Sequence, residues 1–262
     1  MPRKTAANVH AMKILLVVFL LALAGCHSRE DAGPFRAGLS TIEPVHTGIW
    51  SRLVDRKPVL LTFDDGPENL TVDRRILATL AKHHARALWL VTCKQLDPSI
   101  EPNALEHRLA LREILANGNM IGNHGYSHVD LTKLDAPALT REIADCSDLI
   151  RKTTGVSPAY FRPPFGRHTS SVDKAIQADG MQLLLWGGNS FDSLFARFKQ
   201  QPGTFAGYIA AHPIYDVALN AGPGDVLLFH DYPNTAIALD GILTRLEQRG
   251  FQFVLPQANA SS

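Results

Sequence analysis

Short apolar runs alternate with amphipathic stretches along most of the chain, beginning near residue 57. The run Val59–Phe63 is apolar or β-branched throughout and has no helical period, which predicts a strand buried on both faces. Residues 69–84 follow and carry apolar side chains at the spacing of an amphipathic helix, at Val72, Ile76, Leu77 and Leu80. The folded region is therefore expected to open with a strand and a helix.

The same alternation continues to the end of the chain. Further apolar runs predict strands over residues 87–91, 120–123, 159–162, 181–186, 225–229 and 251–255. Amphipathic stretches between them predict helices over residues 105–116, 136–152, 171–178 and 235–249. About seven strand–helix units without a long polar linker predict a single α/β domain, a distorted (β/α)7–8 barrel of mostly parallel strands. An open, doubly wound sheet is the alternative, but no dinucleotide-binding glycine motif follows the first strand.

The beginning of the chain has a different character. Residues 14–24 form an unbroken apolar run behind basic residues that include Arg3 and Lys13. At about eleven residues the run is too short for a membrane-spanning helix, which needs about twenty. A short apolar run behind a positive segment predicts a secretory signal peptide. Met12 begins a well-formed signal of its own, so either Met1 or Met12 is the true start.

The apolar run ends in Leu23-Ala24-Gly25-Cys26, which resembles the lipobox of bacterial lipoproteins. The resemblance implies that residues 1–25 are a signal peptide and that Cys26 is lipidated, with several acyl chains that together anchor the protein stably. We expect residues 26–56 to form the lipidated N-terminus and a tether. The expected location is periplasm-facing after secretion across the inner membrane; His27 in place of aspartate favours the outer membrane.

Composition and charge exclude several classes of protein. Lys and Arg number 26 and Asp and Glu number 25, so the net charge of +1 argues against a nucleic-acid partner. A hydrophobic content of 45% excludes intrinsic disorder, and three cysteines do not make a disulfide scaffold. Cys93 and Cys146 would lie in an oxidising compartment, where a disulfide is allowed. We expect two separate buried thiols, because nothing in the sequence places the two Cα atoms within reach.

Residues capable of chemistry gather directly after the predicted strands. They are Asp64, Asp65, His124, His128, Arg162, Asn189, Asp192, His230 and Asp231. In a parallel barrel the active site is built at the carboxyl ends of the strands. We therefore expect these side chains to converge on one site.

Two of these residues, His124 and His128, are four positions apart. On one helical turn this spacing would place both imidazoles on the same side, where a carboxylate can complete a three-ligand metal site. Three protein ligands leave positions open for water and substrate, as in a catalytic site. One of Asp64 and Asp65 can bind the metal while the other accepts a proton, although Asp-Asp-Gly-Pro alone would indicate only a turn.

Four motifs occur in order along the chain, Thr62–Pro67, His124–His128, Arg162–Gly166 and Leu227–Asp231. Together they resemble the signature motifs of the polysaccharide deacetylases, carbohydrate esterase family 4, also called the NodB homology domain. The similarity covers residues 57–256 and leaves 257–262 as a tail. It implies a metal-dependent hydrolase of non-peptide carbon–nitrogen bonds, which removes N-acetyl groups from an N-acetylglucosamine-containing polysaccharide at the cell envelope.

The resemblance also assigns roles at the metal. Asp64 would be the general base, and Asp65, His124 and His128 would be the ligands of a divalent metal. The metal is usually zinc in this family, with cobalt, nickel and manganese as alternatives. Arg162 would position the base carboxylate.

Further roles follow from the same resemblance. His230 would be the general acid, and Asp192 would raise its pKa by stabilising the charged imidazolium. Leu228 would line the pocket for the acetyl methyl group, and the backbone N–H of Phe165 would help hold the oxyanion. Tyr126 either lines the cleft or packs beneath it.

Two departures from the family pattern affect the expected substrate pocket. Gly125 stands where the family has Ser or Thr, so a hydrogen bond that stabilises the loop is expected to be missing. A further family motif, which lies before the last of the four, reads Asn189 to Ser193 and lacks its usual tryptophan, which leaves one wall of the acid's pocket undefined. The remaining histidines, among them His83 and His107, are expected at the surface or at helix ends.

Several alternatives stay open on the sequence. The polysaccharide could be peptidoglycan, poly-N-acetylglucosamine or chitin oligomers, which share the same acetamide. An O-acetyl esterase of the xylan type would use the same site, and a related fold hydrolyses cyclic amides. A lipoprotein that binds glycan without catalysis is the alternative outside the enzymes. The oligomeric state is also open.

Overall fold

In the part of the chain that the structure describes, eight parallel strands form one central sheet. The structure is a computed structural model, and it describes residues 57–195 and 212–256. The strands are β1 (Lys57–Asp65), β2 (Ala87–Val91), β3 (Met120–Asn123), β4 (Tyr160–Phe161), β5 (Gln182–Leu183), β6 (Gly188–Asn189), β7 (Val226–His230) and β8 (Phe251–Phe253). Their order is β5-β4-β3-β2-β1-β7-β6, and β8 pairs with the first residues of β1.

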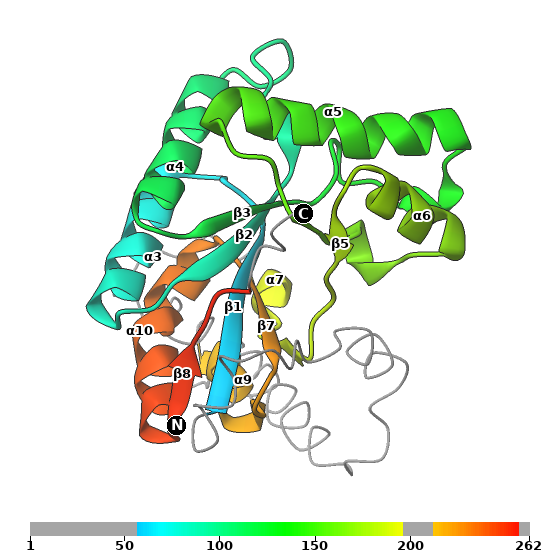
Figure 1. Cartoon of the computed structure of the whole chain (residues 1–262). Coiled ribbons are helices and arrows are strands. Elements are labelled where there is room, and N and C mark those ends of the chain that lie inside the picture. The colour runs from blue at the N-terminus through cyan, green and yellow to red at the C-terminus, as the bar shows by residue number, and fades with distance from the viewer. Residues whose placement is uncertain (1–56, 196–211, 257–262) are drawn as a thin grey trace, which may run out of the picture.

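The sheet curls into an incomplete barrel with helices on its outer face (Figure 1). These are α3 (Leu70–Lys82), α4 (Ala104–Ala116), α5 (Ala136–Thr154), α6 (Ser170–Ala178), α7 (Asp192–Phe195), α9 (Asp216–Asn220) and α10 (Pro233–Gln248). Within the described residues, β5 and β6 end the strand order and do not pair with each other. The prediction of a distorted, mostly parallel (β/α) barrel is confirmed, with an opening between these two strands.

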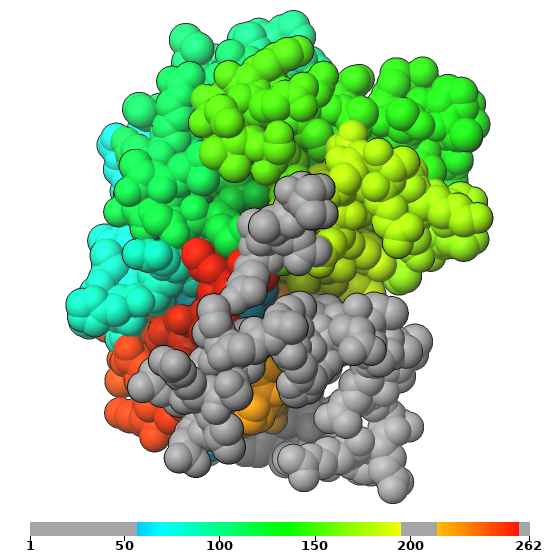
Figure 2. Space-filling model, in the orientation of Figure 1, coloured from blue at the N-terminus to red at the C-terminus, as the bar shows by residue number. Residues whose placement is uncertain are grey.

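The outer helices pack side by side in a continuous layer. Contacts join α10 to α3, α3 to α4, α4 to α5 and α5 to α6. Figure 2 shows their side chains as one surface that runs from orange through cyan and green to yellow-green. No helix in the described ranges has both the length and the apolar character needed to cross a membrane. Residues 1–56, with Cys26 and the predicted signal peptide, and residues 257–262 lie outside the described ranges.

Strand β1 lies between β2 and β7, so most of its residues are buried on both faces. The ring of Phe63 stacks on Trp89 of β2 with a centroid distance of 4.7 Å, and lies 5.7 Å from Phe229 of β7. All three side chains are buried almost completely. Such aromatic packing stabilises the sheet directly below the ends of β1 and β7, where the polar motif residues begin.

Local capping residues set the helix ends. The Asn69 side chain accepts hydrogen bonds from the backbone N–H groups of Thr71 and Val72 at 3.0 and 3.2 Å, and so caps α3. Asp135 caps α5 in the same way. Gly155 ends α5 with a left-handed φ of 77°, which glycine adopts without steric cost.

The strand predicted over residues 181–186 is much shorter in the structure, so that prediction is wrong in length. Only Gln182 and Leu183 pair with β4. The carbonyl oxygens of Leu184 and Leu185 instead accept hydrogen bonds from the Arg162 guanidinium, at 3.1 and 3.3 Å. The buried guanidinium thus occupies backbone carbonyl groups that would pair with a neighbouring strand if β5 were longer.

The expectation of two separate thiols is also wrong. Cys93 and Cys146 form a disulfide, with their Cα atoms 5.2 Å apart. Cys93 begins a short 3-10 helix after β2, and Cys146 lies on the inner face of α5. The two positions are 53 residues apart in sequence, so only the packing of α5 against β3 and the 3-10 helix of Cys93 brings them together.

His83 and His107, which were expected at the surface or at helix ends, are both buried, although His83 does cap the C-terminal end of α3. His83 lies between α3 and α10, with its ring nitrogens 2.8 Å from Asp240 Oδ1 and 3.0 Å from Glu247 Oε2. His107 is buried beside the carbonyl of Gln95, at 3.0 Å. Both side chains connect elements that are distant in sequence, and this explains why their local pattern suggested exposed positions.

Candidate active site

Asp64 and Asp65 end β1 and direct their carboxylates to different partners. Asp64 is paired with His230 in the β1–β7 ladder and is almost fully buried. Asp65 has a positive φ of 74° and precedes a cis peptide bond between Gly66 and Pro67. Aspartate tolerates this backbone region better than most residues. The backbone carbonyl of Asp65 accepts a hydrogen bond from Thr92 Oγ1 at 2.6 Å, which fixes the turn.

Asp65, His124 and His128 form one cluster. The Oδ1 atom of Asp65 lies 3.4 Å from Nε2 of His124 and 3.1 Å from Nε2 of His128. One ligand atom from each residue lies within 4.8 Å of the other two. Burial alone would raise the pKa of Asp65, but protonated imidazoles beside it would hold that pKa well below its usual range. A metal cation between the three side chains would act on the carboxylate in the same direction.

The donor atoms of this cluster fit a divalent metal. Nδ1 of His124 lies 2.6 Å from the carbonyl oxygen of Arg162, which can only accept, so Nδ1 carries the proton and Nε2 presents its lone pair. Oδ1 of Asp65 is buried, and within the described residues it has no hydrogen-bond donor. Acceptor atoms that face one another without a donor repel unless a cation lies between them. Two imidazoles and a carboxylate are the ligands that zinc and related metals prefer.

The two histidines do not lie on a helical turn, so that expectation is wrong. His128 has a φ of 57° and Gly125 a φ of 87°, values that an α-helix excludes. The segment is a loop, and its positive φ at residue 125 suits glycine. The loop brings the imidazoles together by its irregular path, with ring centroids 5.1 Å apart.

Hydrogen bonds from neighbouring elements hold this loop. Asn123 Oδ1 accepts from the backbone N–H of Gly125 at 2.7 Å. Glu142 of α5 accepts from the N–H groups of Tyr126 and Ser127 at 3.1 and 2.9 Å, and also from the Ser127 hydroxyl. These bonds stabilise the loop without a hydroxyl at position 125. Asn123 and Glu142 were missed by the motif analysis, and only the adjacency of Asn123 to the first histidine could have indicated a role.

The guanidinium of Arg162 donates a hydrogen bond to the carboxylate of Asp64. Nη1 of Arg162 lies 2.6 Å from Asp64 Oδ1 and 2.8 Å from Thr62 Oγ1. The guanidinium is completely buried, and burial lowers the pKa of Arg162 while Asp64 raises it. The second oxygen, Oδ2, lies 3.8 Å from Nε2 of His124, beside the metal cluster. One oxygen of Asp64 is therefore bound to arginine and the other faces the site.

His230 ends β7 on the other side of the cluster, where Asp192 holds it. Nδ1 of His230 lies 2.7 Å from Asp192 Oδ1, and the backbone N–H of His230 donates to Asp192 Oδ2 at 2.7 Å. Burial lowers the pKa of His230, but the hydrogen bond and charge of Asp192 raise it to about 9. The imidazole is therefore mostly protonated at neutral pH, and Nε2 points toward Asp65 Oδ2 at 3.8 Å.

Residues at the start of α10 support this pair. Thr235 Oγ1 donates to Asp192 Oδ2 at 2.7 Å, and Asn234 Nδ2 donates to the Asp192 carbonyl at 2.9 Å. The hydroxyl of Tyr232 donates to Asp65 Oδ2 at 3.3 Å, and its ring stacks on His230 with a centroid distance of 5.1 Å. The motif analysis missed all three. Their sole signal was their position directly after the last motif.

The substrate-side residues occupy different positions. Phe165 has a φ of 62°, exposes 55% of its surface and packs its ring edge-on to His128 at 4.7 Å. Leu228 is buried on β7. Tyr126 donates its hydroxyl to Asp97 and packs against the main hydrophobic cluster, and burial with the Asp97 charge raises its pKa to about 12. The contacts of Tyr126 are those of a packing residue.

The departures in the motif Asn189–Ser193 lie beside the acid. Asn189 Oδ1 accepts from the backbone N–H of Phe191 at 2.7 Å and so stabilises the turn before Asp192. Ser193, which replaces the usual tryptophan, is exposed. Phe191 has a φ of 56° and exposes 56% of its surface two positions earlier. An exposed aromatic ring is therefore present near the acid, although not at the tryptophan position.

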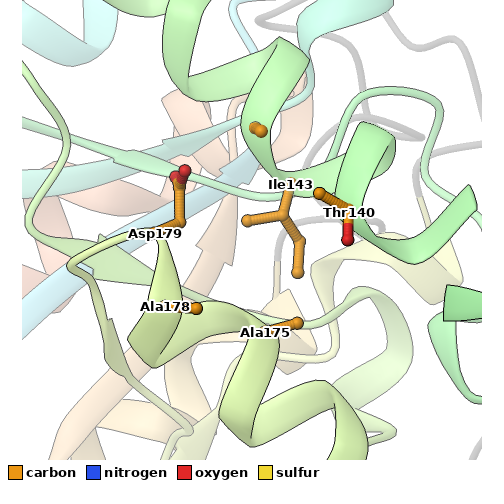
Figure 3. A pocket seen from close by; sticks show the side chains of 6 residues that line it. Thr140, Ile143, Ala175, Ala178 and Asp179 are labelled. Atoms are coloured by element: carbon orange, nitrogen blue, oxygen red, sulfur yellow. The ribbon is translucent and has the colours of Figure 1, made fainter. Parts of the chain in front are cut away.

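A separate pocket of about 130 Å³ lies between α5 and α6. Figure 3 shows that Thr140 and Ile143 face Ala175 and Ala178 across it, with Asp179 at its edge. None of the predicted site residues lines this pocket. It is a packing gap between two helices rather than part of the metal site.

Comparison with known proteins shows which family the chain belongs to. The polysaccharide deacetylase family matches residues 52–184, about half of the chain, and the chain belongs to this family. The resemblance found in the four motifs is thereby confirmed at the level of family membership.

Individual members of the family that resemble this chain are peptidoglycan deacetylases by name. The chain is 31% identical over 202 residues to the peptidoglycan-N-acetylmuramic acid deacetylase PdaC of Bacillus subtilis, across 76% of this chain and 38% of that protein. It is 30% identical over 199 residues to the peptidoglycan-N-acetylglucosamine deacetylase PgdA of Listeria monocytogenes, with the same coverages of 76% and 38%. A structure of PdaC superimposes with a TM-score of 0.62 at 30% identity, over 76% of this chain and 88% of that one. The chain thus spans about two fifths of these curated relatives.

Proposed function

We propose that this protein is a metal-dependent N-deacetylase of a polysaccharide that contains N-acetylglucosamine or N-acetylmuramic acid. The main support for this proposal is that Asp65, His124 and His128 lie together. Oδ1 of Asp65, which has no hydrogen-bond donor among the described residues, faces the two imidazole nitrogens. A carboxylate held by arginine lies on one side of this cluster, and an imidazole held by a carboxylate lies on the other. Base, metal ligands and acid are the groups that amide hydrolysis by water requires.

The base is proposed to be Asp64, acting through Oδ2. Its Oδ1 is bound to Arg162 at 2.6 Å, so the carboxylate cannot rotate freely and Oδ2 stays beside the cluster. From there Oδ2 can accept the proton of an attacking water. A zinc ion held by the three ligands would lower the pKa of water and polarise the acetyl carbonyl.

The acid is proposed to be His230, acting through Nε2. Its Nδ1 is bound to Asp192, so the proton available to the leaving amine is the one on Nε2. A pKa of about 9 keeps that proton in place at neutral pH. Protonation of the amine is needed because an amine anion is a poor leaving group, and such proton transfer contributes about 10²–10⁴-fold to the rate.

The remaining residues are proposed to shape the acetyl pocket. The backbone N–H of Phe165 would stabilise the oxyanion, and the buried side chain of Leu228 would contact the acetyl methyl group. The exposed ring of Phe165, edge-on to His128, provides an apolar surface beside the site.

The substrate is proposed to be peptidoglycan, because PdaC and PgdA are named for peptidoglycan deacetylation. The two names differ in the sugar, N-acetylmuramic acid in one and N-acetylglucosamine in the other. O-acetyl ester hydrolysis is the second candidate, since the same groups would suffice for an ester.

Acetate release from a panel of glycans tests the proposal. Purified residues 27–262 would be assayed on peptidoglycan, poly-N-acetylglucosamine, chitin oligomers and acetyl-xylan. We expect acetate from an N-acetylated glycan, and at least ~100-fold lower turnover in His230→Ala and Asp65→Ala. Wild-type turnover in both variants would reject the assignment, and release from acetyl-xylan alone would favour the esterase. Tight glycan binding without acetate release would favour the non-catalytic alternative.

The location is a further part of the proposal. The lipobox-like Leu23–Cys26 supports a lipid anchor at the cell envelope, where peptidoglycan lies. Cys26→Ser should move the protein from the membrane fraction to the soluble fraction. Unchanged membrane fractionation of the variant would contradict a lipid anchor.

A further inference from the structure

The first turn of α10 contacts both halves of the candidate site. Tyr232 precedes the helix and Pro233 begins it, which fixes the direction of the chain after His230. Tyr232 contacts Asp65 and His230, whereas Thr235 contacts Asp192. A short segment outside the family motifs therefore touches a metal ligand, the acid and the partner of the acid.

The two oxygens of Asp65 have separate surroundings. Oδ1 faces the Nε2 atoms of His124 and His128 at 3.4 and 3.1 Å. Oδ2 points the other way and accepts a hydrogen bond from the Tyr232 hydroxyl at 3.3 Å. A phenol that donates to Oδ2 fixes the rotation of the carboxylate and keeps Oδ1 toward the imidazoles. Hydrogen bonds of this kind to a ligand carboxylate are common around metals and affect metal affinity.

The ring of Tyr232 has a different contact from its hydroxyl. It lies parallel to the imidazole of His230, with 5° between the ring planes and 5.1 Å between the centroids. The imidazole is also bound to Asp192 through Nδ1, so ring and carboxylate together restrict its orientation. The hydroxyl and the ring of Tyr232 can be tested separately, because phenylalanine keeps the ring and removes only the hydroxyl.

We propose that Tyr232 is a positioning residue, whose hydroxyl orients Asp65 for the metal and whose ring orients His230. The inference rests on the proposed function, since it takes the Asp65, His124 and His128 cluster as a metal site. It assigns Tyr232 no contact with substrate. Its effect is on metal affinity through the hydroxyl and on turnover through the ring.

Thr235 provides a matched control from the same turn. Its hydroxyl donates to Asp192 at 2.7 Å, so Thr235→Val removes a hydrogen bond on the acid side only. Tyr232→Phe and Thr235→Val each delete one hydroxyl from the first turn of α10. A general disturbance of this turn would change metal affinity in both variants, whereas loss of the Asp65 contact would change it only in Tyr232→Phe.

Zinc affinity of the metal-free protein is the primary measurement, by competition with a fluorescent zinc chelator. We expect the zinc Kd to rise about 10–100-fold in Tyr232→Phe and to stay within about twofold of wild type in Thr235→Val. At saturating zinc, Tyr232→Phe should recover most of the wild-type kcat. Tyr232→Leu should bind zinc as weakly as Tyr232→Phe and keep a lower kcat even when saturated, because it also loses the ring.

The outcomes separate the inference from the proposed function. Equal zinc Kd values for wild type and Tyr232→Phe would overturn the role of the hydroxyl, and a wild-type kcat in saturated Tyr232→Leu would overturn that of the ring. A wild type that binds no zinc would instead reject the metal site. If Tyr232→Phe does not fold, the absorption spectrum of bound cobalt in Tyr232→Trp tests the same contact. A spectrum identical to wild type would overturn the inference, and an altered one would support it.

Discussion

A buried pair of carboxyl groups lies behind the turn that carries Asp65. Asp73 of α3 and Asp231, the residue after His230, are 0% and 1% exposed. Among the described residues neither oxygen of Asp73 meets a hydrogen-bond donor, and Oδ1 of the neighbouring Asp231 carboxyl also lacks one. Asp231 also accepts the backbone N–H of Glu68 at 2.8 Å. A proton kept by one of the two carboxyls would supply the donor that these buried oxygens lack.

This arrangement predicts how stability depends on pH. Burial and the charge of Asp231 raise the pKa of Asp73 far above its ordinary value. The folded protein therefore holds a proton that the unfolded chain releases above about pH 4. The free energy of unfolding consequently falls as pH rises, by about 1.4 kcal/mol per pH unit for one proton. Asp73→Asn replaces the acid with an amide that donates permanently, so this dependence should disappear.

Urea denaturation at several pH values tests the prediction. From pH 5.5 to 7.5, the difference in free energy of unfolding between Asp73→Asn and wild type should grow in favour of the variant by about 2.7 kcal/mol. Taking the difference cancels titrations that both proteins share, including that of His230. Asp148→Asn, at a partly exposed position on α5, controls for the loss of one ionisable carboxyl. Parallel stability curves for Asp73→Asn and wild type would refute the shared proton.

Three further predictions concern the site. Asp192 raises the pKa of His230 to about 9, so Asp192→Asn should lower that pKa and move the alkaline limb of the pH profile of kcat to lower pH. At pH 8, kcat should fall roughly tenfold or more. An unmoved alkaline limb would contradict the assignment of His230 as the acid. Gly66→Ala should lower the free energy of unfolding by about 1–3 kcal/mol, and with it the melting temperature, because a Cβ there would lie 2.1 Å from Asp231 Oδ2. A wild-type melting curve would show that the turn is not this tight. A chelator should abolish acetate release, zinc or cobalt should restore it, and activity that survives metal removal at unchanged circular dichroism would exclude a catalytic metal.

The sequence alone determined the strand–helix alternation, because each element has its own local period of apolar residues. The caps at Asn69 and Gly155 are equally local, since capping depends on a few neighbouring backbone groups. The candidate site residues could be found as well, because parallel strands deliver their C-terminal residues to one edge of the barrel. Asp64 and His230 were expected together on that ground, and β1 and β7 pair them directly.

Tertiary structure alone decided the contacts between residues distant in sequence. The Cys93–Cys146 disulfide depends on how α5 packs against β3 and the 3-10 helix of Cys93, and no local pattern encodes that packing. Arg162 shortens β5 because its buried guanidinium needs carbonyl acceptors, a demand that strand propensity does not contain. The contact of Tyr232 with Asp65 crosses 167 residues of sequence, so it exists only once β1 and β7 lie side by side.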